Sequence, residues 1–150
     1  MSDKKPIIGI TLGDFNGVGP ETIIKVLADG RINKFCTPVV YGHQGIFSQY
    51  RKILNVDNFN LNKVEDDLTN LHLKKSNIKI CWDNDYQITP GQPTNESSIA
   101  ALNSIKTAAN DLKEGVLDGV VTAPISKEHI KKIQPDFIGH TELFTNLFPD

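Results

Sequence analysis

Short apolar runs alternate along the chain with segments in which apolar residues recur at helical spacing. Ile7 to Leu12 is an apolar, β-branched run, which is typical of a strand buried on both faces of a sheet. A glycine-rich turn follows it. Residues 20–30 then predict a helix, because Pro20 suits the first helical position and Gly30 suits the C-cap. The start of the chain therefore predicts a strand, a loop and a helix.

The same alternation continues along the rest of the chain. Further strands are predicted where short runs are rich in β-branched residues, at residues 38–41, 78–82 and 116–122. Residues 55–75 are rich in Asn, Asp and Lys and predict only a short irregular strand or hairpin. The prolines and glycine of residues 89–93 predict a loop.

Helical spacing marks two longer segments. One helix face is predicted to carry Ile46, Phe47, Tyr50, Ile53 and Leu54, and residues 96–114 predict a second helix. Ser126 is placed to cap a short helix, and a last helix is predicted to begin at His140 or Thr141. Strands alternating with helices predict the α/β class, with a mostly parallel sheet, helices on both faces and ligands at the carboxyl ends of the strands.

The composition favours one soluble domain and argues against two classes of partner. The chain has 150 residues, 39% hydrophobic and 23% charged, which is enough to form a core. The chain has 16 Lys and Arg against 18 Asp and Glu, and its basic residues form no continuous block. Nucleic acid is therefore not expected as a partner. The apolar stretch before Gly13 is too short for a signal peptide or a bilayer span, so we expect no membrane and a cytoplasmic location. Cys36 and Cys81 lack metal-ligand spacing and are predicted to be buried small hydrophobic residues.

The first candidate site is the loop that carries Gly13, Gly17 and Gly19. Its spacing matches neither the dinucleotide fingerprint nor the phosphate loop. Three glycines would let the backbone approach a ligand closely, and the helix from Pro20 would aim its free amides at an anion or a cofactor edge. The alternative is a tight strand-to-helix turn with no ligand.

The second and third candidate sites follow the last strand. Thr122, Ser126 and Lys127 place hydroxyls, a helix start and a lysine at a strand's carboxyl end, which suits a phosphate; a solvated lysine is the alternative. One charge-assisted contact from Lys127 would be worth about 1.5–3 kcal/mol. Further on, Gly139-His140-Thr141-Glu142 groups proton donors and acceptors in one turn, unless the histidine is purely structural. Covalent acyl transfer has no support, because Gly-x-Ser-x-Gly is absent.

Three segments, taken in order, resemble the signature segments of the 4-hydroxythreonine-4-phosphate dehydrogenase family. They are residues 9–21, 121–128 and 139–142. The resemblance covers the whole chain but only the amino-terminal part of the family, whose members are about twice this long. It implies a fold similar to the isocitrate and isopropylmalate dehydrogenase lobes and a homodimer at full length. Residues 1–125 would form the first lobe, and residues 126–150 would be the start of a truncated second lobe.

The resemblance also implies a reaction. NAD would oxidise the C3 hydroxyl of 4-phosphohydroxy-L-threonine to 2-amino-3-oxo-4-phosphooxybutanoate, which decarboxylates to 3-amino-2-oxopropyl phosphate in vitamin B6 biosynthesis. A divalent metal (Zn, Mg or Co), held by histidines, would polarise the reacting oxygen. Because nothing in this sequence offers three convergent ligands, those ligands are expected beyond residue 150.

Residue by residue, the resemblance assigns His140 and Thr141 to the substrate, together with Lys127 and Thr122. The glycine-rich loop is similar to the family's Gly-Asp-Pro-Ala-Gly-Ile-Gly-Pro-Glu and would contribute to cofactor binding through Gly13, Asp14, Gly17, Gly19 and Glu21. Phe15 and Asn16 stand where the family has Pro-Ala, which predicts a bulkier and more polar loop tip.

Three other functions stay open. A related dehydrogenase could act on other four-carbon acid phosphates, such as threonate or erythronate 4-phosphate. A phosphate-binding transferase could use the same loops without moving a hydride. A non-enzymatic binding lobe would need neither reaction.

Overall fold

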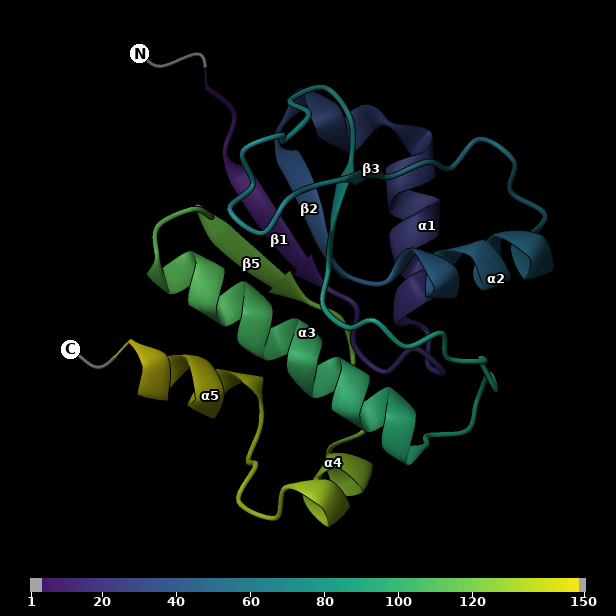
Figure 1. The fold of residues 1–150 in the computed structure, drawn as a ribbon, viewed down its shortest axis with the longest axis vertical. Coiled ribbons are helices and arrows are strands. Elements are labelled where there is room, and N and C mark those ends of the chain that lie inside the picture. The colour runs from purple at the N-terminus through teal and green to yellow at the C-terminus, as the bar shows by residue number, and fades with distance from the viewer. Residues whose placement is uncertain (1–3, 149–150) are drawn as a thin grey trace.

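A computed structural model describes residues 4–148 as a parallel sheet covered by helices (Figure 1). The five strands are all paired in parallel, in the order β3-β4-β2-β1-β5. The strands are β1 (Ile7–Thr11), β2 (Thr37–Gly42), β3 (Asn62–Lys63), β4 (Asn77–Ile80) and β5 (Gly119–Thr122). The helices are α1 (Gly19–Asp29), α2 (Gln44–Leu54), α3 (Asn95–Lys113), α4 (Lys127–Ile133) and α5 (His140–Leu147), with a 3₁₀ turn η1 (Arg31–Lys34) after α1.

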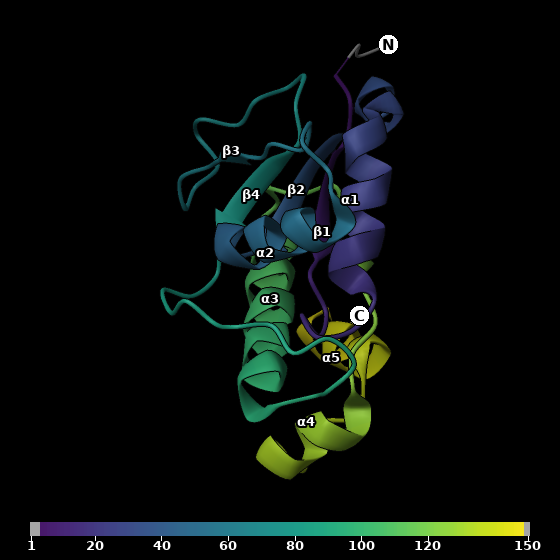
Figure 2. The same ribbon diagram turned by 90° about the vertical axis from the view of Figure 1, so that its right-hand side faces the viewer.

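Helices α1 and α2 cover one face of the sheet, and α3 covers the other (Figure 2). Alternate residues of β2 serve the two faces, because side chains point to opposite sides along a strand. Val40 packs into the cluster formed with α1 and α2, whereas Val39 and Tyr41 pack with Ala108 of α3. The predicted α/β fold is therefore confirmed.

Helices α4 and α5 lie beside α3 (Figure 1). Ile130 of α4 and Phe137 pack against Ala101 and Leu102 of α3, and all four residues are buried. The lobe boundary after residue 125 stays a prediction. No helix within residues 4–148 has the length and apolar character needed to cross a membrane.

Three local expectations are wrong. The last strand begins at Gly119 rather than at residue 116, because Gly115 has a φ of +81° and the Val116 amide bonds back to Asp111. Ile53 lies outside the buried face of α2 and is 61% exposed. Cys81 is only partly buried, although Cys36 is buried as expected.

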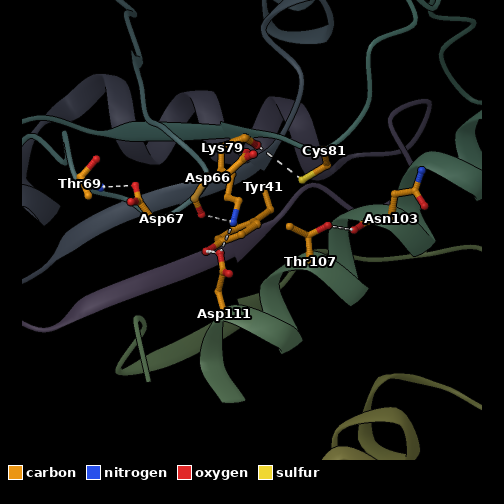
Figure 3. Close-up of polar contacts among 9 residues, drawn as sticks. All are labelled: Tyr41, Asp66, Asp67, Thr69, Lys79, Cys81, Asn103, Thr107 and Asp111. Carbon is orange, nitrogen blue, oxygen red and sulfur yellow. Dashed lines mark hydrogen bonds and ion pairs between the residues drawn. The ribbon is translucent and has the colours of Figure 1, made fainter. Parts of the chain in front are cut away.

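A buried polar network connects the sheet to α3 (Figure 3). The Lys79 ammonium lies 2.8 Å from Asp111 Oδ2, and the Tyr41 hydroxyl donates to the same oxygen at 2.7 Å. Lys79 also donates to the carbonyl of Asp66 at 2.6 Å. Burial raises the pKa of the Tyr41 hydroxyl above its usual range, and the Asp111 carboxylate raises it further. The hydroxyl is therefore a fixed donor at neutral pH.

Candidate functional site at the carboxyl edge of the sheet

The glycine-rich loop after β1 packs directly against the segment that follows β5. Gly13 has a φ of +74°, and a Cβ at this position would lie 2.3 Å from the carbonyl oxygen of Pro124. A Cβ on Gly19 would lie 2.5 Å from the carbonyl oxygen of Leu12. The Asp14 amide donates to the Pro124 carbonyl at 3.0 Å. Two of the predicted site loops therefore meet, and close backbone packing accounts for both glycines without a ligand.

The two residues at the tip of this loop, Phe15 and Asn16, are buried and contact residues 86–92. Phe15 is 1% exposed and stacks on Tyr86 with ring centroids 5.6 Å apart. The Asn16 side chain accepts a hydrogen bond from the Thr89 amide at 2.7 Å and donates to the Gln92 carbonyl at 2.9 Å. The expectation of a bulkier, more polar tip is wrong, because both side chains turn inward and fix the loop to residues 86–92.

A hollow of about 250 Å³ opens between these loops. Asp14 lines it and is 5% exposed; its Oδ1 accepts from the Asn16 amide, whereas its Oδ2 is buried and has no partner among the described residues. Gly17 and Ser126 line the same hollow. Ser126 stands at the N-cap of α4 as predicted, but its side chain makes no capping hydrogen bond. Buried polar atoms are normally paired, so Asp14 Oδ2 is an acceptor without a donor.

A second group of polar side chains gathers around Gly139. A Cβ at Gly139 would lie 3.1 Å from Lys127 Nζ and 3.0 Å from Glu142 Oε2, so an ammonium and a carboxylate occupy the space that a side chain would fill. His140 follows directly and is partly buried. Its Nε2 is buried and has no hydrogen-bond partner within residues 4–148. The predicted substrate residues Lys127 and His140 are therefore close in space.

Thr122 and Glu21 are not part of these two groups, whereas Thr141 directly follows His140 in the chain. Thr122 ends β5 and lines a different hollow, beside α1. Glu21 forms an ion pair with Lys25 at 2.8 Å on α1. Thr141 is exposed on the first turn of α5. Among the described residues, no three His, Cys, Asp or Glu side chains are arranged to hold a metal ion. The described residues therefore do not form a binding site for the metal ion that the resemblance implies.

Burial lowers the pKa of His140, and the nearby Lys127 ammonium lowers it further. Because the folded pKa lies below the ordinary value of about 6.5, the histidine contributes to stability above that pH. This contribution is lost as the pH falls through the folded pKa. We expect the ring protons of His140 to titrate below pH 6.5 by NMR, and Lys127→Met to raise the midpoint. A midpoint at or above 6.5 in the unmodified chain would contradict this.

The molecule is an α/β domain in which the glycine-rich loop after β1 and the segment after β5 meet at the carboxyl edge of a parallel sheet. The same fold is found in the 4-hydroxythreonine-4-phosphate dehydrogenase of Burkholderia phymatum, with a TM-score of 0.80, 26% identity, and coverage of 97% of this chain and 44% of that one. The enzyme of that name from Klebsiella pneumoniae has a TM-score of 0.76, 27% identity, and coverage of 97% and 45%. The family profile described as "Pyridoxal phosphate biosynthetic protein PdxA" matches residues 34–150. This chain belongs to the PdxA family.

Two similar curated proteins carry different names. A 4-hydroxythreonine-4-phosphate dehydrogenase of Bacteroides thetaiotaomicron is 36% identical over 143 residues, covering 95% of this chain and 38% of its own length. A protein of Oceanobacillus iheyensis, provisionally named D-threonate 4-phosphate dehydrogenase, is 34% identical over 148 residues, covering 96% and 44%. The chain thus spans about two-fifths of the length of the relatives that it matches.

Proposed function

We propose that this chain supplies the substrate-binding amino-terminal part of an NAD- and metal-dependent dehydrogenase of 4-phosphohydroxy-L-threonine. The product would lose carbon dioxide to give 3-amino-2-oxopropyl phosphate for vitamin B6 synthesis. One observation carries the proposal, in a chain of this family. Lys127 Nζ lies 3.1 Å from the position of a Cβ at Gly139, and the next residue, His140, has a buried Nε2 with no hydrogen-bond partner among the described residues. The complete enzyme would be a cytoplasmic homodimer.

Each of the two side chains has a distinct part in the proposal. The exposed Lys127 ammonium would bind the substrate phosphate, a contact worth about 1.5–3 kcal/mol. The neutral His140 imidazole would hydrogen-bond the substrate through Nε2, which supports the proposal because a buried ring nitrogen is costly without a partner. Substrate reaches this atom only if the side chains covering it move, so we expect α5 to shift on binding. The Thr141 hydroxyl would add a further contact.

The cofactor part of the proposal rests on the hollow beside Asp14. Its volume of about 250 Å³ is below the roughly 300–1,000 Å³ of ordinary ligand pockets, so it would take one portion of a dinucleotide. Asp14 Oδ2 could accept a hydrogen bond from a cofactor hydroxyl. NAD, when bound, supplies the hydride acceptor. No step is assigned to a metal, because the described residues offer no site for it.

A second candidate substrate is D-threonate 4-phosphate, which is favoured by the names of the relatives at 31% and 34% identity. The two substrates share the phosphate and the C3 hydroxyl. They differ at C2, where one carries an amino group and the other a hydroxyl. The Lys127 and His140 contacts proposed above would serve either.

The test is NADH formation at 340 nm by a chimaera in which residues 1–150 are followed by the carboxyl-terminal part of the Bacteroides thetaiotaomicron relative. We expect turnover with 4-phosphohydroxy-L-threonine, less with D-threonate 4-phosphate, and none by the 150-residue chain alone. Higher turnover with the threonate ester would replace the first substrate by the second. A folded chimaera that oxidises neither substrate would refute the proposed function. Turnover by the 150-residue chain alone would refute the expectation that these residues do not form a complete active site.

His140→Ala in this chimaera should lower kcat/KM at least about tenfold, equivalent to about 1.4 kcal/mol of transition-state binding. The reason is the loss of the hydrogen bond proposed for Nε2. His129→Ala is a matched control, because His129 contacts Asn95 on α3 rather than the Gly139 group. A kcat/KM that is the same for both variants would remove His140 from the site.

A further inference from the structure

A polar hollow of about 190 Å³ lies at the amino ends of the strands. It opens between the 3₁₀ turn η1, residues 58–60 and residues 74–76, which directly precede β4. Figure 2 shows this end of the sheet on the opposite side of the molecule from α4 and α5. The hollow is therefore separate from the candidate site at the carboxyl edge.

The lining of this hollow combines two lysines with an amide donor that lacks a partner. Lys74 and Lys75 are both exposed and line it. Asn33, on η1, also lines it, and its Nδ2 is buried with no hydrogen-bond partner among the described residues. No acidic residue belongs to the described lining. A buried donor without a partner, in a hollow that two lysines line, is suited to the oxygens of an anion.

The turn that carries the two lysines is fixed by a buried asparagine. Asn77, the first residue of β4, is 0% exposed. Its Nδ2 donates to the carbonyl oxygens of His72 and Lys75, both at 3.0 Å, and its Oδ1 accepts from the His72 amide at 2.9 Å. The Lys74 amide donates to His72 Nδ1 at 3.2 Å. The backbone of this turn is therefore held in one conformation, although both lysines are exposed.

Lys5 connects this turn to η1. Its Nζ donates to the carbonyl oxygen of Asn33 at 2.6 Å and to that of Leu73 at 2.9 Å. The ammonium of Lys5 thus joins two walls of the hollow and adds a third positive charge near it. Walls that are already fixed lose less conformational entropy when a ligand binds, which favours a binding site over a chance group of surface lysines.

We propose that this hollow binds the phosphate group of a small ligand through the Asn33 amide and the ammonium groups of Lys74 and Lys75. Three donors on two segments match the three terminal oxygens of a phosphate, whereas a carboxylate offers two. A volume of about 190 Å³ leaves room for the phosphate and only a small part of the molecule that carries it. The proposal is independent of the reaction proposed above, because these residues take no part in it.

The test is NMR of the nitrogen-15-labelled 150-residue chain during titration with inorganic phosphate at constant ionic strength. The signals followed are the Asn33 side-chain amide and the backbone amides of residues 74–76. The ring protons of His140 are followed in the same titration and report separately on the candidate substrate site. A parallel titration with acetate measures what a carboxylate does at the same positions.

Three variants examine the proposed contacts. Lys74→Gln combined with Lys75→Gln should weaken phosphate binding at the Asn33 signal at least tenfold, because both ammonium groups are lost. Lys52→Gln combined with Lys113→Gln is the matched control, since it removes the same charge from exposed positions on α2 and α3 and should leave binding unchanged. Asn33→Asp should also weaken binding, because a carboxylate replaces the donor. Circular dichroism confirms that the variants are folded.

We expect the Asn33 and 74–76 signals to shift to saturation at millimolar phosphate. No shift at these signals, or equal weakening by the two double lysine variants, would overturn the proposal. Acetate that binds as tightly as phosphate would overturn the assignment to a phosphate group. Shifts confined to His140 would place phosphate only at the candidate substrate site, so failure of this proposal and failure of the proposed function are distinguishable.

Discussion

Asp111→Ala is expected to lower the free energy of unfolding by about 3–5 kcal/mol, because it leaves Lys79 charged and buried without its carboxylate partner. The two side chains are 9% and 8% exposed, so water cannot replace the lost contact. The Tyr41 hydroxyl loses its acceptor at the same time. Urea denaturation followed by circular dichroism measures the loss.

The exposed ion pair of Asp29 with Arg31 provides the control for this prediction. Asp29→Ala breaks a pair on the surface and should leave the unfolding midpoint close to that of the unmodified chain. Replacing both Lys79→Met and Asp111→Leu should recover most of the loss, since no unpaired charge stays buried. A loss below about 1 kcal/mol for Asp111→Ala would show that the buried pair contributes little.

Gly13→Ala is expected to destabilise the protein by about 3 kcal/mol, combining two costs. A left-handed φ of +74° is unfavourable for alanine, and the new Cβ would lie 2.3 Å from the Pro124 carbonyl oxygen, a backbone atom that cannot rotate away. Relief of the clash separates the two loops and breaks the bond from the Asp14 amide to Pro124. Thermal and urea denaturation measure the effect.

Gly30→Ala separates these two costs. Gly30 has a φ of +77° but nothing within 4 Å of the added Cβ, so its substitution reports the backbone cost alone, about 1 kcal/mol. Gly13→Ala should therefore be clearly more destabilising than Gly30→Ala. Equal losses would mean that the contact between the loops does not hold them together.

The order of helices and strands was predictable because each element is indicated by residues close together in the sequence. The apolar run from Ile7 and the Pro20 and Gly30 signals at the ends of α1 depend only on neighbouring residues. The polar network was not predictable, because Tyr41, Lys79 and Asp111 come from three separate elements and none stands out in its own segment. Exposure of Ile53 and Val121 likewise depends on which elements cover them.

The roles of the candidate site residues stay predictions, and only part of their arrangement in space was predictable from the sequence. Parallel strands bring the loops after β1 and β5 to one edge, so the contact of Gly13 and Asp14 with Pro124 follows from the topology. The inward turn of Phe15 and Asn16 could not be foreseen, because their partners lie in residues 86–92. Thr122 lines the hollow beside α1, which spacing alone could not reveal.

The central claim is that the turn around Gly139 binds a phosphorylated substrate through Lys127 and His140. A charge-assisted contact of about 1.5–3 kcal/mol from Lys127 and a hydrogen bond of about 1 kcal/mol from the neutral His140 imidazole give the 150-residue chain an affinity in about the millimolar range. The chain has four histidines, so NMR of their ring protons during titration with 4-phosphohydroxy-L-threonine can follow each one, with His140→Gln assigning the signal. We predict that the His140 signals shift to saturation at millimolar ligand while those of His43 stay in place. Unchanged His140 signals at saturating ligand would contradict the claim.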